Sequence, residues 1–365
     1  MRRAARYIHT SRRRTMAAPT EPTEAIRQTV ADKWLKPNGP PVGTTFGGRL
    51  LKTEDDVFSQ NAWDHAELPP DFKERAEQVM ELHRSSPVAQ DVRDKYNERP
   101  ADYWNKFYSQ HEDGFFKDRG WLRLEFPELV ACSEADAGPK TVLEVGCGAG
   151  NTVFPLIQRN ENPHLTIFAT DYSETAVKVV KANKMYPKAD HGLGVMNASV
   201  WDITSKPSSP DTPDSAATQP PVTYLLPEGI APGTVDVISV IFVLSALHPR
   251  EWKQAIHNLY TALKPGGLLL IRDYGRHDLA QLRIKKNRLL DTPNLYIRGD
   301  GTRVYFFEKE ELEEMLVGAP ADGAVDNRKM FEIQQLGEDR RLLVNRKERL
   351  TMYRIWMQVK ARKLA

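Results

Sequence analysis

The chain has few cysteines and no cluster of metal-ligating side chains. Its 365 residues include two cysteines, Cys132 and Cys147, and nine histidines scattered along the sequence. Two cysteines do not make the disulfide framework of a small secreted domain, so a reducing compartment is the expectation. Structural zinc sites need cysteine or histidine pairs at short spacings, and no such set occurs. We therefore expect no bound metal.

Long apolar runs are absent as well. No segment approaches the roughly 20 apolar residues that are needed to cross a bilayer. Charged residues are 27% of the chain and hydrophobic residues 40%, which is typical of a soluble protein. The net charge of +2 indicates no particular partner, because a nucleic-acid site depends on how charge is distributed.

The N-terminal segment lacks acidic side chains. Its first twenty residues include six arginines, and the first acid is Glu21. Arginine-rich, acid-poor N-termini are typical of mitochondrial presequences, although a disordered basic tail has the same composition. Translation from Met16 would leave the arginines out. We exclude residues 1–45 from the predicted fold and expect a cytoplasmic protein, with a mitochondrial form as the alternative.

Strand and helix patterns alternate from Thr141 onward. Apolar, β-branched runs predict strands at 141–146, 165–171, 194–200, 235–244 and 268–273. Helices are expected at 150–159, 173–184 (capped by Ser173), 249–263 and 308–317. This alternation predicts an α/β, Rossmann-like parallel sheet with helices on both faces. Two late strands of reversed direction would bring the sheet to seven.

Two segments interrupt the main domain, which we place at 136–365. Residues 205–222 are rich in Pro, Ser and Thr and predict an insertion. Residues 264–267, Lys-Pro-Gly-Gly, predict a turn into the fifth strand.

A mostly helical extension, over residues 46–135, precedes this domain. Asp71 is the expected N-cap of a helix that reaches about His83. A second helix should carry Tyr103, Trp104, Phe107 and Tyr108 on one face. Periodicity alone places these aromatic side chains in a core.

A glycine turn follows the first predicted strand of the main domain. It has the pattern E-x-G-x-G-x-G from Glu144 to Gly150, and Asp171 ends the next strand. Glycine lets a backbone approach a bound ligand, because any Cβ would occupy the ligand's space. Dinucleotide enzymes favour G-x-G-x-x-G instead. The pattern resembles motif I of the class I S-adenosylmethionine methyltransferases, although a purely structural corner between strand and helix also uses glycines.

Three carboxylates have the spacing that such a cofactor requires. Glu144 lies beside the turn, near the expected position of the methionine amino group. Asp171 should accept from the ribose hydroxyls. Asp202 follows the third strand and would accept from the adenine amino group, with Ile203 against the ring, although a turn or cap role for Asp202 stays open. Ile241 lies near the end of the fourth strand, where either a ligand contact or a core role fits.

The segment after the fourth strand lacks two motifs of known methyl acceptor sites. Residues 245–249 are not the Asn/Asp-Pro-Pro-aromatic motif of many exocyclic-amine methyltransferases, and they contain no cysteine. The missing thiol argues against covalent addition to a pyrimidine before methylation of its C5. The acceptor is therefore expected to be a nucleophile with its own lone pair.

Basic side chains gather in two stretches. Residues 283–288 read Arg-Ile-Lys-Lys-Asn-Arg, and residues 340–365 contain one acid, Glu348, among many basic residues. Tyr353 and Trp356 lie within the second stretch and could stack on bases. The two stretches favour RNA or DNA as the acceptor, although a solvated charged face is the alternative for each.

Several long motifs together resemble the eukaryotic tRNA 3-methylcytidine methyltransferases. These motifs are 102–108 (Asp-Tyr-Trp-Asn-Lys-Phe-Tyr), 114–122, 125–129, 241–249, 272–275 (Arg-Asp-Tyr-Gly) and 300–307 (Asp-Gly-Thr-Arg-Val-Tyr-Phe-Phe). The upstream segments 46–49 and 61–64 resemble the branch that acts on threonine tRNA. The resemblance covers about residues 46–365. It implies methylation of cytidine-32 in the anticodon loop, with S-adenosylmethionine as cofactor.

The resemblance also implies a site, residue by residue. Trp104 and Tyr108 would close over the cofactor, and the cofactor-binding set becomes Trp104, Tyr108, Gly146, Asp171, Asp202, Ile203 and Ile241. The RNA-binding candidates are Lys117, Arg119, Arg283, Lys285, Lys286, Arg346, Lys347 and Arg349. Three features depart from the family: Ile203 replaces a leucine, Gly120 replaces a histidine, and the 205–222 insertion is long. A tRNA synthetase or another tRNA-binding adaptor is a candidate helper.

Cytosine N3 has an in-plane lone pair and needs no general base. The methylated product is a cation, so a nearby carboxylate would stabilise it as it forms, and Asp202 and Asp273 are the candidates. Two other functions stay open. One is a methyltransferase for proteins or small molecules on the same fold, and the other is an RNA-binding scaffold with a vestigial pocket.

Overall fold

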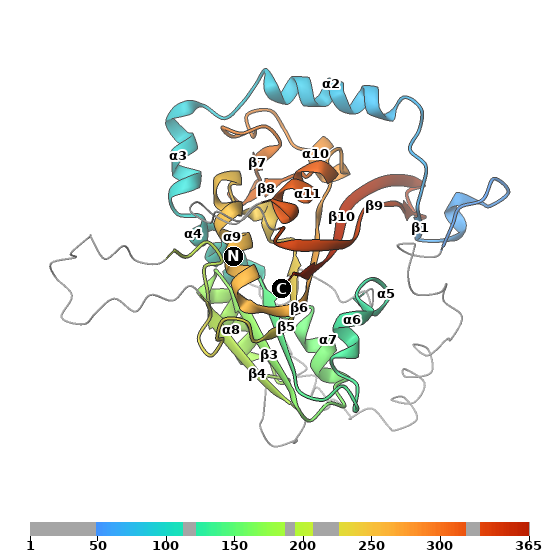
Figure 1. The fold of residues 1–365 in the computed structure, drawn as a ribbon. Coiled ribbons are helices and arrows are strands. Elements are labelled where there is room, and N and C mark those ends of the chain that lie inside the picture. Colours follow the sequence, from blue (N-terminus) through green and yellow to red (C-terminus); the bar gives the residue numbers. More distant parts are fainter. Residues whose placement is uncertain (1–48, 112–121, 187–193, 207–225, 319–328, 365) are drawn as a thin grey trace, which may run out of the picture. The chain divides into compact units, whose positions relative to one another are not determined.

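The computed structural model describes residues 49–111, 122–186, 194–206, 226–318 and 329–364 (Figure 1). The basic N-terminal segment, the loop with Lys117, Arg119 and Gly120, and most of the predicted insertion lie outside these residues. Residues 49–365 form one compact unit. Within the described residues, no helix is long and apolar enough to span a membrane.

An eight-stranded sheet runs through this unit in the order β1-β9-β10-β6-β5-β2-β3-β4. The strands are β1 (Ala62–Asp64), β2 (Lys140–Val145), β3 (Leu165–Asp171), β4 (Val195–Val200), β5 (Val235–Ile241), β6 (Leu263–Tyr274), β9 (Phe331–Asn345) and β10 (Leu350–Lys363). The five strands from β4 to β6 pair in parallel, and β10 pairs antiparallel with both β6 and β9. The α/β, Rossmann-like prediction is confirmed.

The predicted strand count of seven was wrong by one. The eighth strand is β1, which comes from the N-terminal extension and pairs antiparallel with β9 at the sheet edge. Three residues carry too short a pattern to be recognised as a strand. Trp63 nevertheless anchors β1, because its side chain is buried and its Nε1 donates to the carbonyl of Val57 at 2.8 Å.

Two strand boundaries also differ from the prediction. β5 ends at Ile241 rather than at residue 244, because Phe242 has φ of 57°, which an extended strand does not allow. β6 begins at Leu263 rather than at 268. Leu263 pairs with Val235 and Leu268 with Val237, so the Lys-Pro-Gly-Gly segment is a bulge inside the strand pairing rather than a turn that precedes it.

Helices flank the sheet on both faces. They include α7 (Val153–Gln158), α8 (Glu174–Ala182), α9 (Pro249–Ala262) and α11 (Lys309–Val317). Apolar side chains form two separate large clusters, one built on α9 and α11 and the other on α7 and α8. The predicted cap is confirmed, since Ser173 Oγ accepts from the N–H of Ala176 at 3.1 Å.

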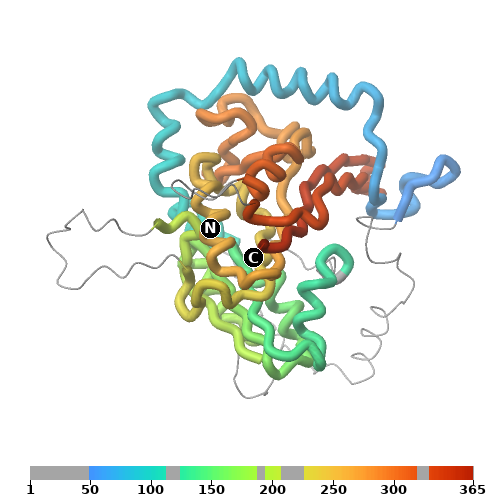
Figure 2. The backbone as a smooth tube through the Cα atoms, viewed as in Figure 1, coloured from blue at the N-terminus to red at the C-terminus, as the bar shows by residue number. Residues whose placement is uncertain are grey.

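Helices α2 (Phe72–Arg84) and α3 (Gln90–Glu98) run along the C-terminal part of the chain (Figure 2). The helices α4 (Pro100–His111), α5 (Leu122–Glu125) and α6 (Pro127–Ala131) follow before β2. α2 contacts α10 (Leu279–Leu282), and α4 packs on α8. Asp71 occupies the N-cap position of α2, as expected. Its side chain makes no capping hydrogen bond and instead pairs with Arg75 at 3.1 Å.

A small two-stranded sheet lies outside the main one. It pairs β7 (Leu295–Ile297) with β8 (Arg303–Tyr305), and a 3-10 helix, η3 (Leu244–Ala246), lies against β8. This contact brings the segment after β5 next to Arg303, which is far away in the sequence.

Candidate functional site

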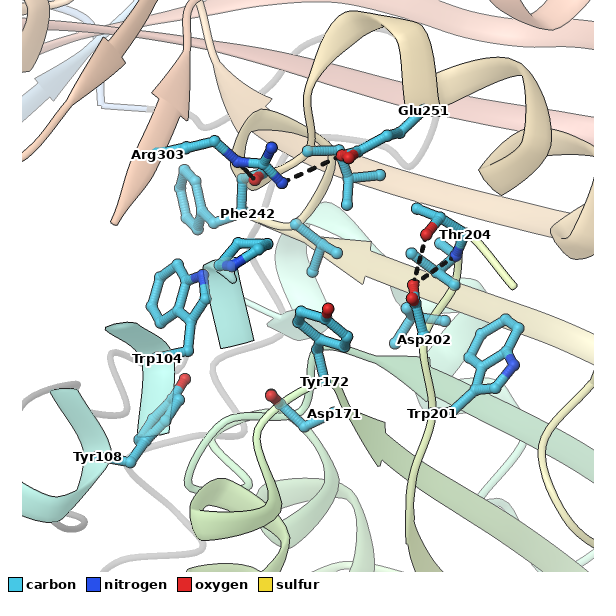
Figure 3. Close-up of a pocket in the computed structure, with 17 residues that line it drawn as sticks. Trp104, Tyr108, Asp171, Tyr172, Trp201, Asp202, Thr204, Phe242, Glu251 and Arg303 are labelled. Carbon is cyan, nitrogen blue, oxygen red and sulfur yellow. Dashed lines mark hydrogen bonds and ion pairs between the residues drawn. The ribbon is translucent and has the colours of Figure 1, made fainter. Parts of the chain in front are cut away.

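The carboxyl ends of the parallel strands border a cavity (Figure 3). Such ends meet at one edge of an open α/β sheet, which is where ligands of this fold class bind. The strand ends contribute Val145, Gly146, Asp171, Tyr172, Trp201, Asp202, Ile203, Thr204, Phe242 and Val243. Helix α4 contributes Pro100, Trp104 and Tyr108, and the remaining lining residues are Ala246, Leu247, Glu251 and Arg303.

The cavity has three parts. The floor is formed by Gly146, Asp171, Asp202 and Ile203. The lid is formed by Trp104 and Tyr108. The far wall is formed by Phe242, Glu251 and Arg303, which lie across the cavity from Asp171 in Figure 3.

Asp171 ends β3 and is held by the backbone around it. Its Oδ2 accepts from the N–H of Gly148 at 2.9 Å, and its Oδ1 accepts from the N–H of Ser173 at 2.8 Å. Burial raises the pKa of Asp171 to about 6, although these backbone N–H groups pull it down. An ionised carboxylate therefore lines the cavity at neutral pH. Each of its oxygens has a second lone pair for a hydroxyl group of a ligand.

The glycine turn leaves space that the protein itself fills. Gly146 has φ of 67°, and a Cβ there would lie 2.3 Å from Cγ2 of Val243. Gly148 has φ of 54°, and a Cβ there would lie 2.7 Å from the hydroxyl oxygen of Tyr108. Neither position accepts a side chain. These close approaches are to the segment after β5 and to the lid, and a close approach of the turn to a ligand stays a prediction.

Glu144 does not line the cavity. Its side chain is 3% exposed and interacts with Thr152 and the backbone of Val153 at the start of α7. Burial raises the pKa of Glu144 to about 8, and its Oε2 has no hydrogen-bond partner within the described residues. Its carboxyl group interacts with the start of α7, and a position beside a methionine amino group stays a prediction.

Asp202 and Ile203 are both in the floor. Asp202 Oδ1 accepts from the N–H of Thr204 at 2.8 Å and from its hydroxyl at 2.7 Å. This is the turn role that the sequence left open, and it fixes the carboxylate at the cavity rather than removing it. Ile203 is buried and lies beside it in the lining.

The lid reaches the cavity because α4 is fastened to the end of β3. Asn105 Oδ1 accepts from the hydroxyl of Ser173 at 2.7 Å and from the N–H of Thr175 at 3.2 Å. Trp104 and Tyr108 stack at 6.1 Å between ring centroids. Burial raises the pKa of the Tyr108 hydroxyl well above its usual value, so this group stays neutral. The sequence did not indicate this role of Asn105, because no pattern in α4 shows that its side chain accepts hydrogen bonds from residues at the start of α8.

Ile241 packs in the cluster of α7 and α8, and the residues after it line the cavity in its place. Phe242 adopts φ of 57°, a conformation that is rare for an aromatic residue and occurs at functional sites. Its N–H donates to the carbonyl of Arg272 at 2.7 Å, and its ring lies 4.8 Å from the ring of Tyr274. A ligand contact of Ile241 stays a prediction.

Asp273, a candidate for stabilising the cationic product, is fully buried and does not line the cavity. Its Oδ2 accepts from the N–H of Ser245 at 2.9 Å, and its Oδ1 accepts from the N–H of Tyr274 at 2.9 Å. Burial raises the pKa of Asp273 to about 6. Its visible role is to hold the segment after β5 in place.

Arg303 and Glu251 were not among the predicted site residues. Arg303 Nη2 donates to Glu251 Oε2 at 3.1 Å, and Arg303 Nε donates to the carbonyl of Ala246 at 3.1 Å. The two residues lie 52 positions apart on β8 and α9. The only sequence signal is the motif 300–307, whose arginine is the sole charged residue after Asp300.

The predicted RNA-binding residues within the described chain are exposed. Arg283, Lys285 and Lys286 lie between α10 and β7, and Arg346, Lys347 and Arg349 lie at the turn between β9 and β10. The Arg349 guanidinium lies 4.0 Å from the centre of the Phe58 ring. The positions are compatible with a binding role, which stays a prediction.

Other basic residues of the C-terminal stretch pair with acids and rings of the protein itself. The guanidinium groups of Arg272 and Arg354 lie 4.8 and 4.9 Å from the Trp356 ring centre. Arg354 also pairs with the buried Asp278 at 2.8 Å, and Lys360 pairs with Glu128 at 2.7 Å. Trp356 is thus packed among arginines within the sheet, and stacking of its ring on bases stays a prediction.

The cavity residues suit S-adenosylmethionine. The ionised Asp171 can accept from ribose hydroxyls, and Asp202 keeps an oxygen, Oδ2, that accepts no hydrogen bond from the described residues. Aromatic rings from the lid and Phe242 border the same space, which suits a sulfonium cation. These features define a class I S-adenosylmethionine-dependent methyltransferase. A family model described as a methyltransferase domain matches residues 119–319, which is more than half of the chain.

Relatives narrow this class. The chain is 45% identical over 322 residues to "tRNA N(3)-methylcytidine methyltransferase trm140" of Schizosaccharomyces pombe, covering 88% of this chain and 93% of that protein. It is also 45% identical over 314 residues to "tRNA(Thr) (cytosine(32)-N(3))-methyltransferase" of Saccharomyces cerevisiae, covering 86% of this chain and 45% of the yeast protein. The Danio rerio protein "tRNA N(3)-cytidine methyltransferase METTL2" is 39% identical, covering 87% of this chain and 89% of that one. The chain belongs to the tRNA N(3)-methylcytidine methyltransferase family.

Proposed function

We propose that this protein transfers a methyl group from S-adenosylmethionine to N3 of cytidine-32 in the anticodon loop of threonine tRNA. One observation carries the proposal. The floor carboxylates and the lid aromatics, which lie far apart in the sequence, border a single cavity in a chain of this family. The yeast relative whose printed name specifies tRNA(Thr) and cytosine 32 supports the choice of substrate.

The residues of the chain hold and enclose the reactants. Asp171 would hold the ribose, Asp202 the adenine amino group, and Trp104 and Tyr108 would exclude water above them. The cofactor supplies an electrophilic methyl group, so that the N3 lone pair forms the new bond while the electron pair of the broken C–S bond stays on sulfur. No base is needed because N3 carries no proton at neutral pH. The positive charge passes to the cytosine ring.

The substrate nucleotide has to be unpaired to react. N3 of cytosine is engaged whenever the base is paired, so the base must be in a loop or be flipped out of a stack. The exposed basic residues of the 283–288 segment and of the β9–β10 turn would bind the phosphates of the surrounding stem and loop.

The test is methylation by the purified protein of single tRNA transcripts, followed by nucleoside mass spectrometry. Threonine tRNA with cytidine at position 32 should yield 3-methylcytidine, and the same transcript with uridine-32 should yield none. Parallel reactions with and without the cognate synthetase test for a helper. Methylation of protein or of small molecules in place of the tRNA would overturn the proposal.

A further inference from the structure

The far wall of the cavity contains an ion pair that is held rigidly. Glu251 lies in the first turn of α9, and its Oε2 accepts from the N–H of His248 at 2.7 Å as well as from Arg303. Arg303 is fixed from the other side by the carbonyl of Ala246. Both side chains are therefore oriented before any ligand binds, which is what precise recognition requires.

Each member of the pair keeps unused hydrogen-bonding capacity. A guanidinium has five protons, and Arg303 uses one on Nε, one on Nη2 and, at 3.5 Å from Asn97, one on Nη1. Oε1 of Glu251 accepts no hydrogen bond within the described residues. Arg303 is only 3% exposed and lines the cavity, so its unused donors are available to a ligand there rather than to bulk solvent.

The pair lies on the wall of the cavity opposite Asp171. Asp171 and Asp202 would anchor the cofactor at the floor, and Figure 3 shows Arg303 and Glu251 on the opposite wall with Phe242 beside Arg303. Ala246 belongs to the segment after β5, which the sequence indicated as the acceptor side. A carboxylate and a guanidinium side by side thus border the acceptor space.

We propose that Glu251, held in place by Arg303, recognises the N4 amino group of the acceptor cytosine. The Glu251 carboxylate accepts from this amino group and Arg303 orients the carboxylate, which leaves N3 free to face the cofactor. This rests on the proposed function, because it specifies how the same site selects its base. Among the lining residues that the structure describes, Arg303 is the only cation.

The same pair would reject uracil and favour the reaction. Uracil presents O4 where cytosine presents its amino group, and an oxygen opposite a carboxylate is repelled. During methyl transfer, positive charge develops on N3 and spreads to N4. The hydrogen bond from N4 to Glu251 therefore strengthens in the transition state, which is the kind of contact that raises the rate.

The decisive variant is Glu251→Gln. The His248 N–H and Arg303 both donate to one oxygen of this group, so the glutamine oxygen is retained there and its amide NH2 takes the other position. That NH2 group opposes the cytosine amino group and accommodates uracil O4. We expect the affinity ratio for anticodon hairpins with cytidine-32 over uridine-32, measured by fluorescence anisotropy with S-adenosylhomocysteine present, to fall by about tenfold or more.

Glu311→Gln is the matched control. Glu311 also completes a capping box, since its Oε2 accepts from the N–H of Glu308 at 2.7 Å, but it does not line the cavity. It should leave the ratio unchanged. An equal fall in both variants would show a general loss of helix capping and overturn the proposal. Weaker S-adenosylhomocysteine binding in Glu251→Gln, with an unchanged ratio, would assign the pair to the cofactor and overturn it as well.

A modified substrate tests the same contact in the wild-type protein and does not depend on any variant folding. Replacing cytosine-32 by pyrimidin-2-one removes only the amino group, and the hairpin should bind about tenfold more weakly. Unchanged binding would overturn the inference even where the wild-type protein makes 3-methylcytidine. A wild-type protein that makes none defeats the proposed function itself, so the two failures are distinguishable.

Discussion

Asp171 and Tyr108 face the same cavity and are held there in different ways. The floor is fixed by backbone groups, since Asp171 accepts from the N–H groups of Gly148 and Ser173 at the ends of two adjacent strands. The lid is fixed by side chains, through aromatic packing along α4 and the two hydrogen bonds to Asn105 Oδ1.

This difference predicts separate roles for the two parts of the cavity: the floor sets the affinity for the cofactor, and the lid encloses it. A carboxylate held by two backbone N–H groups cannot turn away from the ligand, so the floor has a fixed geometry whether or not the cofactor is bound. A helix held by one asparagine and by ring contacts can shift more easily. We therefore expect the floor to dominate cofactor affinity and the lid to tune it, and four experiments test this ranking.

The largest expected effect is that of Asp171→Asn. An asparagine side chain has one oxygen and no charge, so it cannot replace both acceptor oxygens of Asp171. The affinity for S-adenosylhomocysteine, measured by calorimetry, should therefore fall roughly 100-fold, as expected for the loss of charge-assisted hydrogen bonds. The control is Asp236→Asn. Asp236 also accepts a backbone N–H, from Thr141 at 2.8 Å, but it does not line the cavity. An equal loss in both variants would contradict the assignment of the floor.

Trp104→Ala should have a smaller effect on the same affinity, about tenfold, because a buried aromatic contact contributes on the order of 1 kcal/mol beyond area burial. Phe107→Ala is the control on the same helix. Phe107 is 5% exposed and does not line the cavity, so its loss should lower the melting temperature more than the affinity. If Trp104→Ala weakened binding as much as Asp171→Asn, the ranking of floor over lid would be wrong.

Acidification should weaken binding through the floor. The pKa of Asp171 is raised to about 6, so its carboxylate is protonated as the pH falls below 6, and the affinity should drop about tenfold by pH 5. Because the folded-state pKa is raised, protonation of Asp171 favours the folded state, so the titration of this group does not itself unfold the protein. Trp104→Ala should keep this pH profile, whereas Asp171→Asn should flatten it.

The smallest expected effect on the cofactor is that of Arg346→Glu with Lys347→Glu at the β9–β10 turn. These side chains are exposed and distant from the lining, so cofactor affinity should not change. The affinity for tRNA should fall. The slope of its logarithm against the logarithm of the salt concentration should decrease by the amount expected for the loss of about one to two phosphate contacts. Lys181→Glu with Lys184→Glu makes the same change of charge on exposed positions outside the predicted patches and should leave tRNA binding intact.

The basic residues show where composition misleads. Arg346 and Arg354 belong to one basic stretch, yet the first is exposed and the second pairs with the fully buried Asp278. Composition counts both as cations that could bind a nucleic acid. Which of them is neutralised depends on acids that lie elsewhere in the chain, and local pattern does not identify those acids.

The sequence alone determined the parallel sheet and the floor of the cavity. Alternating apolar strands and helices predict that strand ends meet at one edge, so Gly146, Asp171 and Asp202 had to come together. Only the tertiary structure decided the rest, because it depends on contacts between distant segments. It placed Trp104 and Tyr108 at the cavity, as the family resemblance implied and periodicity did not, left Glu144 and Asp273 out of the lining, and paired Arg303 with Glu251 across 52 residues. Periodicity indicates which face of a helix or strand is buried, but it does not indicate which other segment packs against that face.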